Sequence, residues 1–251
     1  MSHHHTRERR PIDIIAHRGA SGHAPENTLA AFRLAWEMGA DGIEMDVHLS
    51  RDGRIMVHHD EDTARCSDGN LLIAACDSAA LRRLDVGRWK GERFAGERMP
   101  FLEEVLVEVP AGKRVLVEIK VGRAIAPAMR AALAATPVGV EVALISFHAE
   151  ALSECRALLP DIPCYWVIEG EGQPPRLGPQ LIAEARRRGF AGLDPDWQAV
   201  DPGFVRAARG AGLKLLCWTV NAPAAALGLR ALGFDGITTD YPAEQRKVLA
   251  A

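Results

Sequence analysis

Short apolar runs alternate with longer stretches of helical pattern along most of the chain. Such runs are typical of buried parallel strands, and they fall at 13–17, 42–48, 114–120, 142–147, 164–168, 191–194, 214–220 and 236–240. Helical patterns lie between them, among others at 27–38, 124–135, 179–188, 202–211 and 222–232. Several are followed by a residue that tolerates the left-handed conformation after a helix, namely Gly39, Gly189, Gly212 and Gly233. Eight strands separated by helices over 251 residues predict a single (β/α)8 TIM barrel rather than an open sheet, which more often has about five or six strands.

One segment interrupts this alternation. Residues 50–100 hold a short extended piece at 54–58, followed by a polar stretch without a clear period. An ordinary βα loop has roughly 2–6 residues, so we expect an insertion after strand 2, on the carboxyl-terminal face of the barrel where active sites are built. The helix of that unit is expected to begin near Phe101. Residues 1–12 are expected to form an N-terminal tail, and residues 13–251 one barrel domain.

The composition argues against several classes of protein. The formal net charge is −3, so there is no overall basic field to hold nucleic acid. The five cysteines contain no C-x-x-C pair, which argues against a disulfide framework or a structural zinc site. No apolar run reaches the roughly 18 residues of a membrane span, and the N-terminal residues lack the apolar segment of a signal peptide. We therefore expect a cytoplasmic protein without stable membrane association, and either a monomer or a homodimer.

Carboxylates share one face of the second strand. Glu44 and Asp46 lie at i and i+2, which places both on the same side of the strand and about 7 Å apart. The next long strand repeats the pattern, so that Glu118 and Lys120 reach the mouth of the barrel. Three carboxylates without a cysteine favour one hard divalent cation, Mg²⁺ or Ca²⁺, over zinc or copper. The alternative is that these acids pair with arginines or line a solvated mouth.

Histidines are concentrated in the first 60 residues. His17 ends the first strand and is followed by Arg18, whose planar guanidinium suits phosphate oxygens. His59 follows the short extended piece after strand 2. Two imidazoles that face each other across an anion can act as general base and general acid, because their pKa lies near neutral. We expect structural roles for the other candidates, His23, His48 and His58.

Aromatic residues stand where two later strands reach the mouth. Trp218 could cover the apolar face of a small polyol, and Phe147 is placed similarly. The alternative for both is an ordinary core aromatic. Asp240, at the end of the last strand, could orient a neighbouring group or cap the following helix.

Together these residues resemble the glycerophosphodiester phosphodiesterase family. The most specific blocks are His17-Arg18-Gly19, Pro25-Glu26-Asn27-Thr28, Gly42-Ile43-Glu44-Met45-Asp46-Val47, Asp52-Gly53 and His59-Asp60. Supporting blocks further along are Val117-Glu118-Ile119-Lys120, Ser146-Phe147, Trp218-Thr219-Val220-Asn221 and Thr239-Asp240-Tyr241-Pro242. The similarity runs from about residue 14 to 242, and proteins of this family are TIM barrels with an insertion after strand 2.

The resemblance implies metal-dependent hydrolysis of glycerophosphodiesters, such as glycerophosphocholine, to glycerol 3-phosphate and an alcohol. The implied roles are His17 and His59 as the acid–base pair, Arg18 and Lys120 at the phosphate, Trp218 in the glycerol pocket, and Glu44, Asp46 and Glu118 as ligands of the cation. Whether the attacking group is the glycerol 2-hydroxyl or water stays open, as does which histidine is the base.

Three other functions fit parts of the pattern. A metal-dependent lyase or isomerase could use the three carboxylates, but it leaves the pair His17 and Arg18 unexplained. A phosphodiesterase or phospholipase D-like enzyme could act on another lipid-derived diester. A non-catalytic barrel could bind phosphate esters, although all the expected catalytic residues are present.

Overall fold

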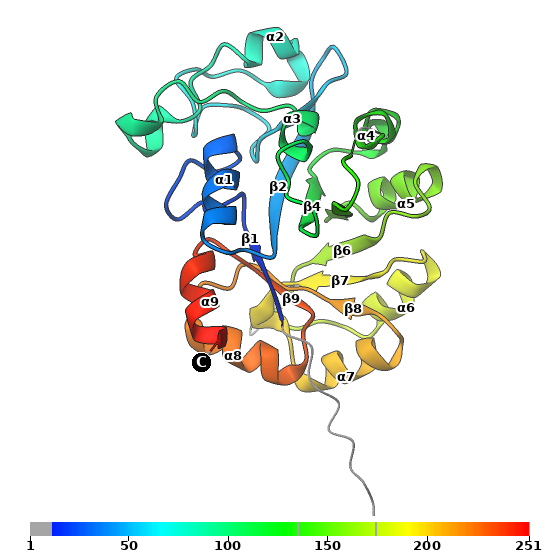
Figure 1. The fold of residues 1–251 in the computed structure, drawn as a ribbon. Helices are drawn as coiled ribbons and strands as arrows, with labels where there is room; N and C mark the ends of the chain where they lie inside the picture. The colour runs from blue at the N-terminus through cyan, green and yellow to red at the C-terminus, as the bar shows by residue number, and fades with distance from the viewer. Residues whose placement is uncertain (1–11, 135, 174, 251) are drawn as a thin grey trace, which may run out of the picture.

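Eight parallel strands follow one another around a nearly closed barrel (Figure 1). The computed structural model describes residues 12–134, 136–173 and 175–250. The strands are β1 (Asp13–Ala16), β2 (Gly42–Leu49), β4 (Arg114–Ile119), β5 (Glu141–Ser146), β6 (Cys164–Ile168), β7 (Gly192–Pro195), β8 (Lys214–Leu215) and β9 (Gly236–Thr239). Their order is β8-β7-β6-β5-β4-β2-β1-β9, which confirms the predicted TIM barrel.

Backbone hydrogen bonds close the barrel between the segments of β8 and β9. The N–H of Asp235 donates to the carbonyl of Leu215, and that of Thr238 to Cys217, each at 2.8 Å. Only Lys214–Leu215 forms regular strand in β8, whereas the sequence predicted a strand to residue 220. Beyond Leu215 the chain makes isolated backbone hydrogen bonds to the neighbouring strand, such as that from the Trp218 N–H to the carbonyl of Pro195 at 3.3 Å.

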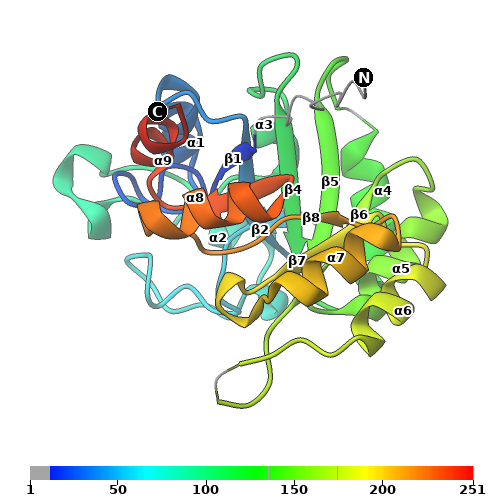
Figure 2. The same ribbon diagram turned by 90° about the horizontal axis from the view of Figure 1, so that it is seen from below.

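Helices surround the strands (Figure 2). They are α1 (Leu29–Glu37), α3 (Leu102–Leu106), α4 (Ala126–Leu133), α5 (Ala149–Leu158), α6 (Gln180–Arg187), α7 (Pro202–Gly210), α8 (Pro223–Leu232) and α9 (Pro242–Ala250). The five predicted helices are confirmed, and the four predicted terminal glycines have φ between +70° and +91°. Helix α1 begins two residues later than predicted because the Thr28 side chain accepts from the Ala31 N–H as an N-cap. The predicted end of the second helix, residue 135, lies outside the described residues.

Two apolar layers result from strand alternation. One fills the barrel interior and contains residues such as Ile15, Leu116 and Val167, while the larger one lies between the strands and the helices. At the carboxyl ends of the strands the interior side chains become polar, which positions the site described below. Among the described residues, no helix has the length and apolar character needed to cross a membrane.

The predicted insertion after strand 2 is present and carries its own small core. It contains β3 (Ile55–Val57), which pairs antiparallel with β2, the helix α2 (Ser78–Leu81), and short 3-10 turns at Ile73–Ala75, Arg88–Lys90 and Glu92–Phe94. Its buried residues are Met56, Ile73, Leu81, Val86 and Met99. It lies beside α1 and α3 at the top of Figure 1, and α3 begins directly after Phe101, as predicted. The tail predicted at 1–12 lies outside the described residues, apart from Ile12.

Candidate active site

A cavity of about 110 Å³ lies at the carboxyl ends of the strands. Eight of the nine predicted site residues line it, and the ninth, Asp46, contacts two of them. The lining residues are His17, Arg18, Glu44, His59, Glu118, Lys120, Ile145, Phe147, Val167, Asp194, Trp218, Thr219 and Thr238. A larger cavity of about 410 Å³ lies at the opposite end of the barrel, where two of its charged residues, Arg114 and Arg209, form ion pairs.

Three carboxylates gather on β2 and β4. Glu44, Asp46 and Glu118 each offer an oxygen, and these atoms lie within 4.8 Å of one another. Among the described residues, Oε1 of Glu44 and Oδ1 of Asp46 are buried and accept no hydrogen bond, although Lys120 forms an ion pair with Asp46 Oδ1. Burial, together with the charges of Asp46 and Glu118, raises the pKa of Glu44 well above its usual range, and burial beside Asp46 also raises the pKa of Glu118. Buried carboxylates this close to one another have the chemistry of a site for a hard divalent cation.

Two cations stand beside these acids. Arg18 Nε lies 3.2 Å from Asp46 Oδ2, and Lys120 Nζ lies 3.3 Å from Asp46 Oδ1 and 2.9 Å from Glu118 Oε1. Burial alone would raise the pKa of Asp46, but the charges of Arg18 and Lys120 outweigh it and lower that pKa. Arg18 has a left-handed backbone, with φ of +55°, and its N–H donates to Glu44 Oε2 at 2.9 Å. The strained turn thus brings the guanidinium and the acids together.

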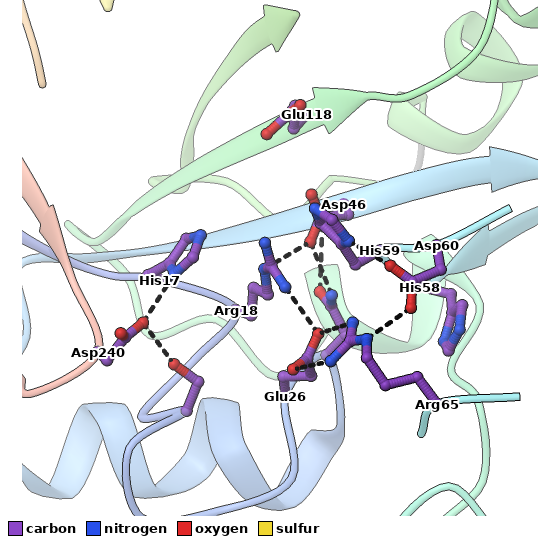
Figure 3. Close-up of polar contacts among 12 residues, drawn as sticks. His17, Arg18, Glu26, Asp46, His58, His59, Asp60, Arg65, Glu118 and Asp240 are labelled. Atoms are coloured by element: carbon purple, nitrogen blue, oxygen red, sulfur yellow. Dashed lines mark hydrogen bonds and ion pairs between the residues drawn. The ribbon is translucent and has the colours of Figure 1, made fainter. Parts of the chain in front are cut away.

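Each of the two predicted catalytic histidines is held by its own carboxylate (Figure 3). His17 Nδ1 lies 2.7 Å from Asp240 Oδ1, and His59 Nδ1 lies 2.7 Å from Asp60 Oδ1. The first role considered for Asp240, orientation of a neighbouring group, is therefore the one that its contacts support. Because both Nδ1 atoms are occupied, Nε2 is the nitrogen that each ring offers to a ligand in the cavity.

The other three candidate histidines make structural contacts. His58 is buried outside the cavity, with Nε2 3.0 Å from the Asp62 carbonyl, and Figure 3 shows its ring beyond Asp60. His48 contacts the carbonyl of His59 at 3.0 Å. The more exposed His23 packs edge-on against Tyr241, 5.6 Å away. Of the neighbouring pair His58 and His59, the second therefore faces the site.

The model of the glycerophosphoryl diester phosphodiesterase family matches residues 17–244, which is most of the chain. The chain belongs to this family. It is 35% identical over 238 residues to a glycerophosphodiester phosphodiesterase of Caldanaerobacter subterraneus subsp. tengcongensis, covering 91% of this chain and 94% of the relative. A Bacillus subtilis glycerophosphodiester phosphodiesterase is 31% identical over 249 residues, covering 92% and 84%.

Solved structures of the family have the same fold. An Oleispira antarctica phosphodiesterase in complex with the product sn-glycerol-3-phosphate superposes with a TM-score of 0.89 at 30% identity, covering 96% of this chain and 98% of that one. As a member of the family, the protein is an enzyme, a phosphoric diester hydrolase with glycerophosphodiester phosphodiesterase activity.

The family motif also explains two residues to which the sequence assigned no role. The Asn27 side chain donates to Asp46 Oδ2 at 2.8 Å and accepts from the Asp46 N–H at 3.2 Å. Glu26 accepts from Arg18 at 2.8 Å, and from Arg65 at 2.9 and 2.8 Å. Both were visible in the block that resembles the family, although spacing alone gave them no function.

Arg65 was missed altogether. It lies in the insertion, and its Nε donates to Asp60 Oδ2 at 2.6 Å while its two terminal nitrogens donate to Glu26. It therefore connects the carboxylate beside His59 to the carboxylate beside Arg18. No periodicity surrounds Arg65 in the sequence, and arginine is common in this chain, so no sequence signal marked it.

The aromatic residues predicted at the mouth form one wall of the cavity. The rings of Phe147 and Trp218 meet edge-on with centroids 5.5 Å apart. Phe147 is 38% exposed, whereas Trp218 is anchored by its Nε1, which donates to the carbonyl of Asp194 at 2.9 Å. This aromatic wall faces the charged residues across the cavity, so the cavity has one polar and one apolar side.

Proposed function

We propose that this enzyme hydrolyses glycerophosphodiesters such as glycerophosphocholine and glycerophosphoethanolamine to glycerol 3-phosphate and an alcohol. The proposal includes one Mg²⁺ or Ca²⁺ as cofactor and His17 and His59 as the acid–base pair. The observation that carries it is the convergence of three carboxylates, two cations and two carboxylate-bound imidazoles around one cavity. The complex of the Oleispira relative with sn-glycerol-3-phosphate supports a small-molecule substrate of this class.

The donor set fits a divalent cation. Glu44, Asp46 and Glu118 carry three formal negative charges, and Arg18 and Lys120 supply only two positive ones. Oε1 of Glu44 has no hydrogen-bond partner among the described residues, and Oδ1 of Asp46 faces the Lys120 ammonium at 3.3 Å. Both are hard oxygen ligands. When bound to these three residues, the cation would act as a Lewis acid that stabilises negative charge on the phosphoryl oxygens.

The remaining groups suit the displacement at phosphorus. Arg18 and Lys120 hold the phosphoryl oxygens and stabilise the charge that builds on them in the transition state. One imidazole Nε2 removes the proton of the attacking hydroxyl, which is the glycerol 2-hydroxyl or water. The other gives a proton to the departing alcohol. Asp240 and Asp60 hold His17 and His59 in the required orientation and stabilise their protonated forms.

The setting of the enzyme is part of the same proposal. We infer that it works in the cytoplasm as a monomer or homodimer on a small diester, with no nucleic acid partner. We also infer that residues 13–251 act as one barrel domain, with about 50–100 as its insertion.

The test is an assay for glycerol 3-phosphate released from glycerophosphocholine, with and without Mg²⁺ or Ca²⁺. We expect activity that chelation abolishes and that one of these cations restores. The double variant Glu44→Gln, Glu118→Gln should be inactive under all conditions, whereas Glu108→Gln should behave like the wild type, because Glu108 is a surface partner of Arg33. Full activity in excess chelator would remove the metal from the mechanism.

A further inference from the structure

Asp194 lines the cavity, but the reaction proposed above gives it no role. Its side chain is 1% exposed, and within the described part of the chain its Oδ1 has no hydrogen-bond partner. The preceding Leu193 packs into the layer between strands and helices, so strand alternation turns Asp194 toward the barrel interior. The indole of Trp218 donates to the backbone carbonyl of Asp194 and not to its carboxyl group.

An unpaired carboxyl is costly to bury. Burial and the charge of Glu118 raise the pKa of Asp194 well above its usual range. A position that only filled space would hold an apolar residue, as Val167 does on the neighbouring strand β6 and Ile145 on β5, the strand after it. A buried polar group without a partner points instead to a ligand that supplies one.

Asp194 does not belong to the cation site. The clustered oxygens come from Glu44, Asp46 and Glu118, and Asp194 is not among the residues of that group. In the barrel order, β7 lies four strands away from β2, so Asp194 stands on the wall opposite Glu44 and Asp46. Ligands of the cation and ligands of Asp194 therefore occupy different sides of the cavity.

The two positively charged side chains that suit a phosphate, Arg18 and Lys120, lie on the far side of the cavity from Asp194. Arg18 follows β1 and Lys120 follows β4, the two neighbours of β2. A substrate with its phosphate beside them reaches Asp194 with the end of the glycerol that is most distant from phosphorus. The apolar wall of Trp218 and Phe147 suits the carbon–hydrogen faces between these two ends.

We propose that Asp194 accepts a hydrogen bond from the terminal hydroxyl of the glycerol moiety and so selects diesters in which this hydroxyl is free. The inference rests on the proposed function, since it requires a glycerophosphodiester in the cavity. A 1-acyl lysophospholipid carries its acyl chain on the same oxygen and has no hydrogen to donate at that position. A site built around a hydrogen bond rejects such a ligand strongly, because its own polar group then stays buried and unpaired.

The test compares glycerophosphocholine with the analogue that contains propane-1,2-diol in place of glycerol. This analogue lacks the terminal hydroxyl but keeps the 2-hydroxyl and the choline. For the wild type we expect kcat/KM to be at least about 10²-fold lower with the analogue. Asp194→Leu should abolish most of this preference, mainly by lowering kcat/KM for glycerophosphocholine. Asp194→Asn keeps an oxygen acceptor and should retain part of it.

Asp196→Asn is the matched control. Asp196 lies two residues further along the chain, and its side chain accepts from the Gln198 N–H at 3.0 Å, so the variant should keep the wild-type preference. Calorimetric binding of glycerol 3-phosphate and of propane-1,2-diol phosphate, with Mg²⁺ present, gives a second readout without turnover. The same loss of discrimination is expected there in Asp194→Leu, without a fall in Tm, since the change removes an unpaired buried carboxyl.

Each other outcome contradicts the inference in a recognisable way. An equal loss for both substrates in Asp194→Leu would make Asp194 a structural residue. If Asp194→Leu instead lost a preference for glycerophosphocholine over glycerophosphoethanol, which has a neutral head group, Asp194 would be assigned to the head group. Wild-type enzyme that hydrolyses glycerophosphocholine and the analogue equally well would refute the inference alone. Failure to release any glycerol 3-phosphate would refute the proposed function and the inference with it.

Discussion

At the scale of single residues, the cavity contains two imidazoles whose Nδ1 atoms are each hydrogen-bonded to a carboxylate. Asp240 holds His17 and Asp60 holds His59, each at 2.7 Å. Burial, with the nearby charge of Arg18, lowers the pKa of His59, while the charge of Asp46 opposes this change. The surroundings of His59 therefore disfavour its protonated form on balance.

Removing either imidazole should reduce turnover without affecting the fold. We expect His17→Ala and His59→Ala each to lower kcat by at least about 10²-fold, the usual scale for a general acid or base. The measurement is glycerol 3-phosphate release at saturating glycerophosphocholine, with circular dichroism as the check on folding. His148→Ala is the control, because His148 is exposed and lies outside the cavity. A wild-type rate in either cavity variant would contradict the acid–base assignment.

The carboxylates also predict a coupling between cation binding and protons. Since burial and two acidic neighbours raise the pKa of Glu44, the cation-free cluster should bind a proton more readily than a free carboxylate does, and a cation should displace that proton. Titration of Mg²⁺ by calorimetry in two buffers of different ionisation enthalpy should show release of protons on binding. Glu44→Gln should abolish the release, and Glu108→Gln should leave it unchanged. Binding without proton release in the wild type would contradict the prediction.

At the scale of elements, strand periodicity made much of the site predictable. Side chains alternate along a strand, so Glu44 and Asp46 had to share one face, and the same rule joined Glu118 to Lys120. Parallel strands then brought both pairs to one end of the barrel. Asp194 obeys the same rule, but a single acid in a short apolar run carried no partner in the sequence to give it meaning.

The insertion was predictable only as an insertion. Its length excluded an ordinary loop, yet its inner arrangement depends on short turns packed around a small separate core, including Met56 and Met99, which leaves no helical or strand period. The ion pairs that this segment makes with the loop after β1 join residues far apart in the sequence. Arg65 and Glu26 are 39 positions apart, for example, and no local pattern reports such a contact.

Arg65 should act on the reaction through the residues that it holds. We expect Arg65→Ala to lower kcat by about 10–100-fold, a size typical of residues that orient a catalytic or ligating group, because Asp60 loses its second partner. Arg65→Lys should recover part of the loss. The pH profile of kcat should also shift, since the charge beside His59 and Asp60 changes.

Arg51 provides the control within the same insertion. It forms an ion pair with Asp77 at 2.6 Å on the surface, so Arg51→Ala should leave kcat and its pH profile unchanged. If Arg65→Ala matched Arg51→Ala in both respects, the insertion would have no part in positioning His59.

At the scale of the whole molecule, a network of polar contacts at this end of the barrel connects segments that are distant in the sequence. Glu26, in the loop after β1, is bound by Arg18 and by Arg65 of the insertion. Lys90 of the insertion donates to the Ser21 carbonyl at 2.7 Å, and Asp240, after β9, binds His17 and Ser21. The insertion, the first loop and the last strand are thus tied together by groups whose charges depend on pH.

This network of polar contacts predicts that the folded state loses stability at acidic pH. Burial alone would raise the pKa of Glu26, but hydrogen bonds and charge from Arg65 and Arg18 outweigh it and lower that pKa to about 2, from 4.5. A carboxyl with a depressed pKa stabilises the folded state fully above its unfolded value. That contribution is lost as the pH falls from about 4.5 toward 2. Between pH 6 and pH 3 the loss of folding free energy from Glu26 should amount to about 2 kcal/mol.

Urea unfolding of the wild type and of Glu26→Gln at pH 6 and pH 3 measures this contribution. At pH 6 the variant should be less stable, because two arginines lose their shared carboxylate. At pH 3 the gap should narrow, since Glu26 of the unfolded wild-type chain is then protonated and its folded form gains less from remaining charged. Glu108→Gln controls for the loss of a glutamate elsewhere on the surface. A gap that stayed constant from pH 6 to pH 3 would mean that Glu26 stabilises the barrel by packing and not through its charge, and the arginines would then be held to the loop by other contacts.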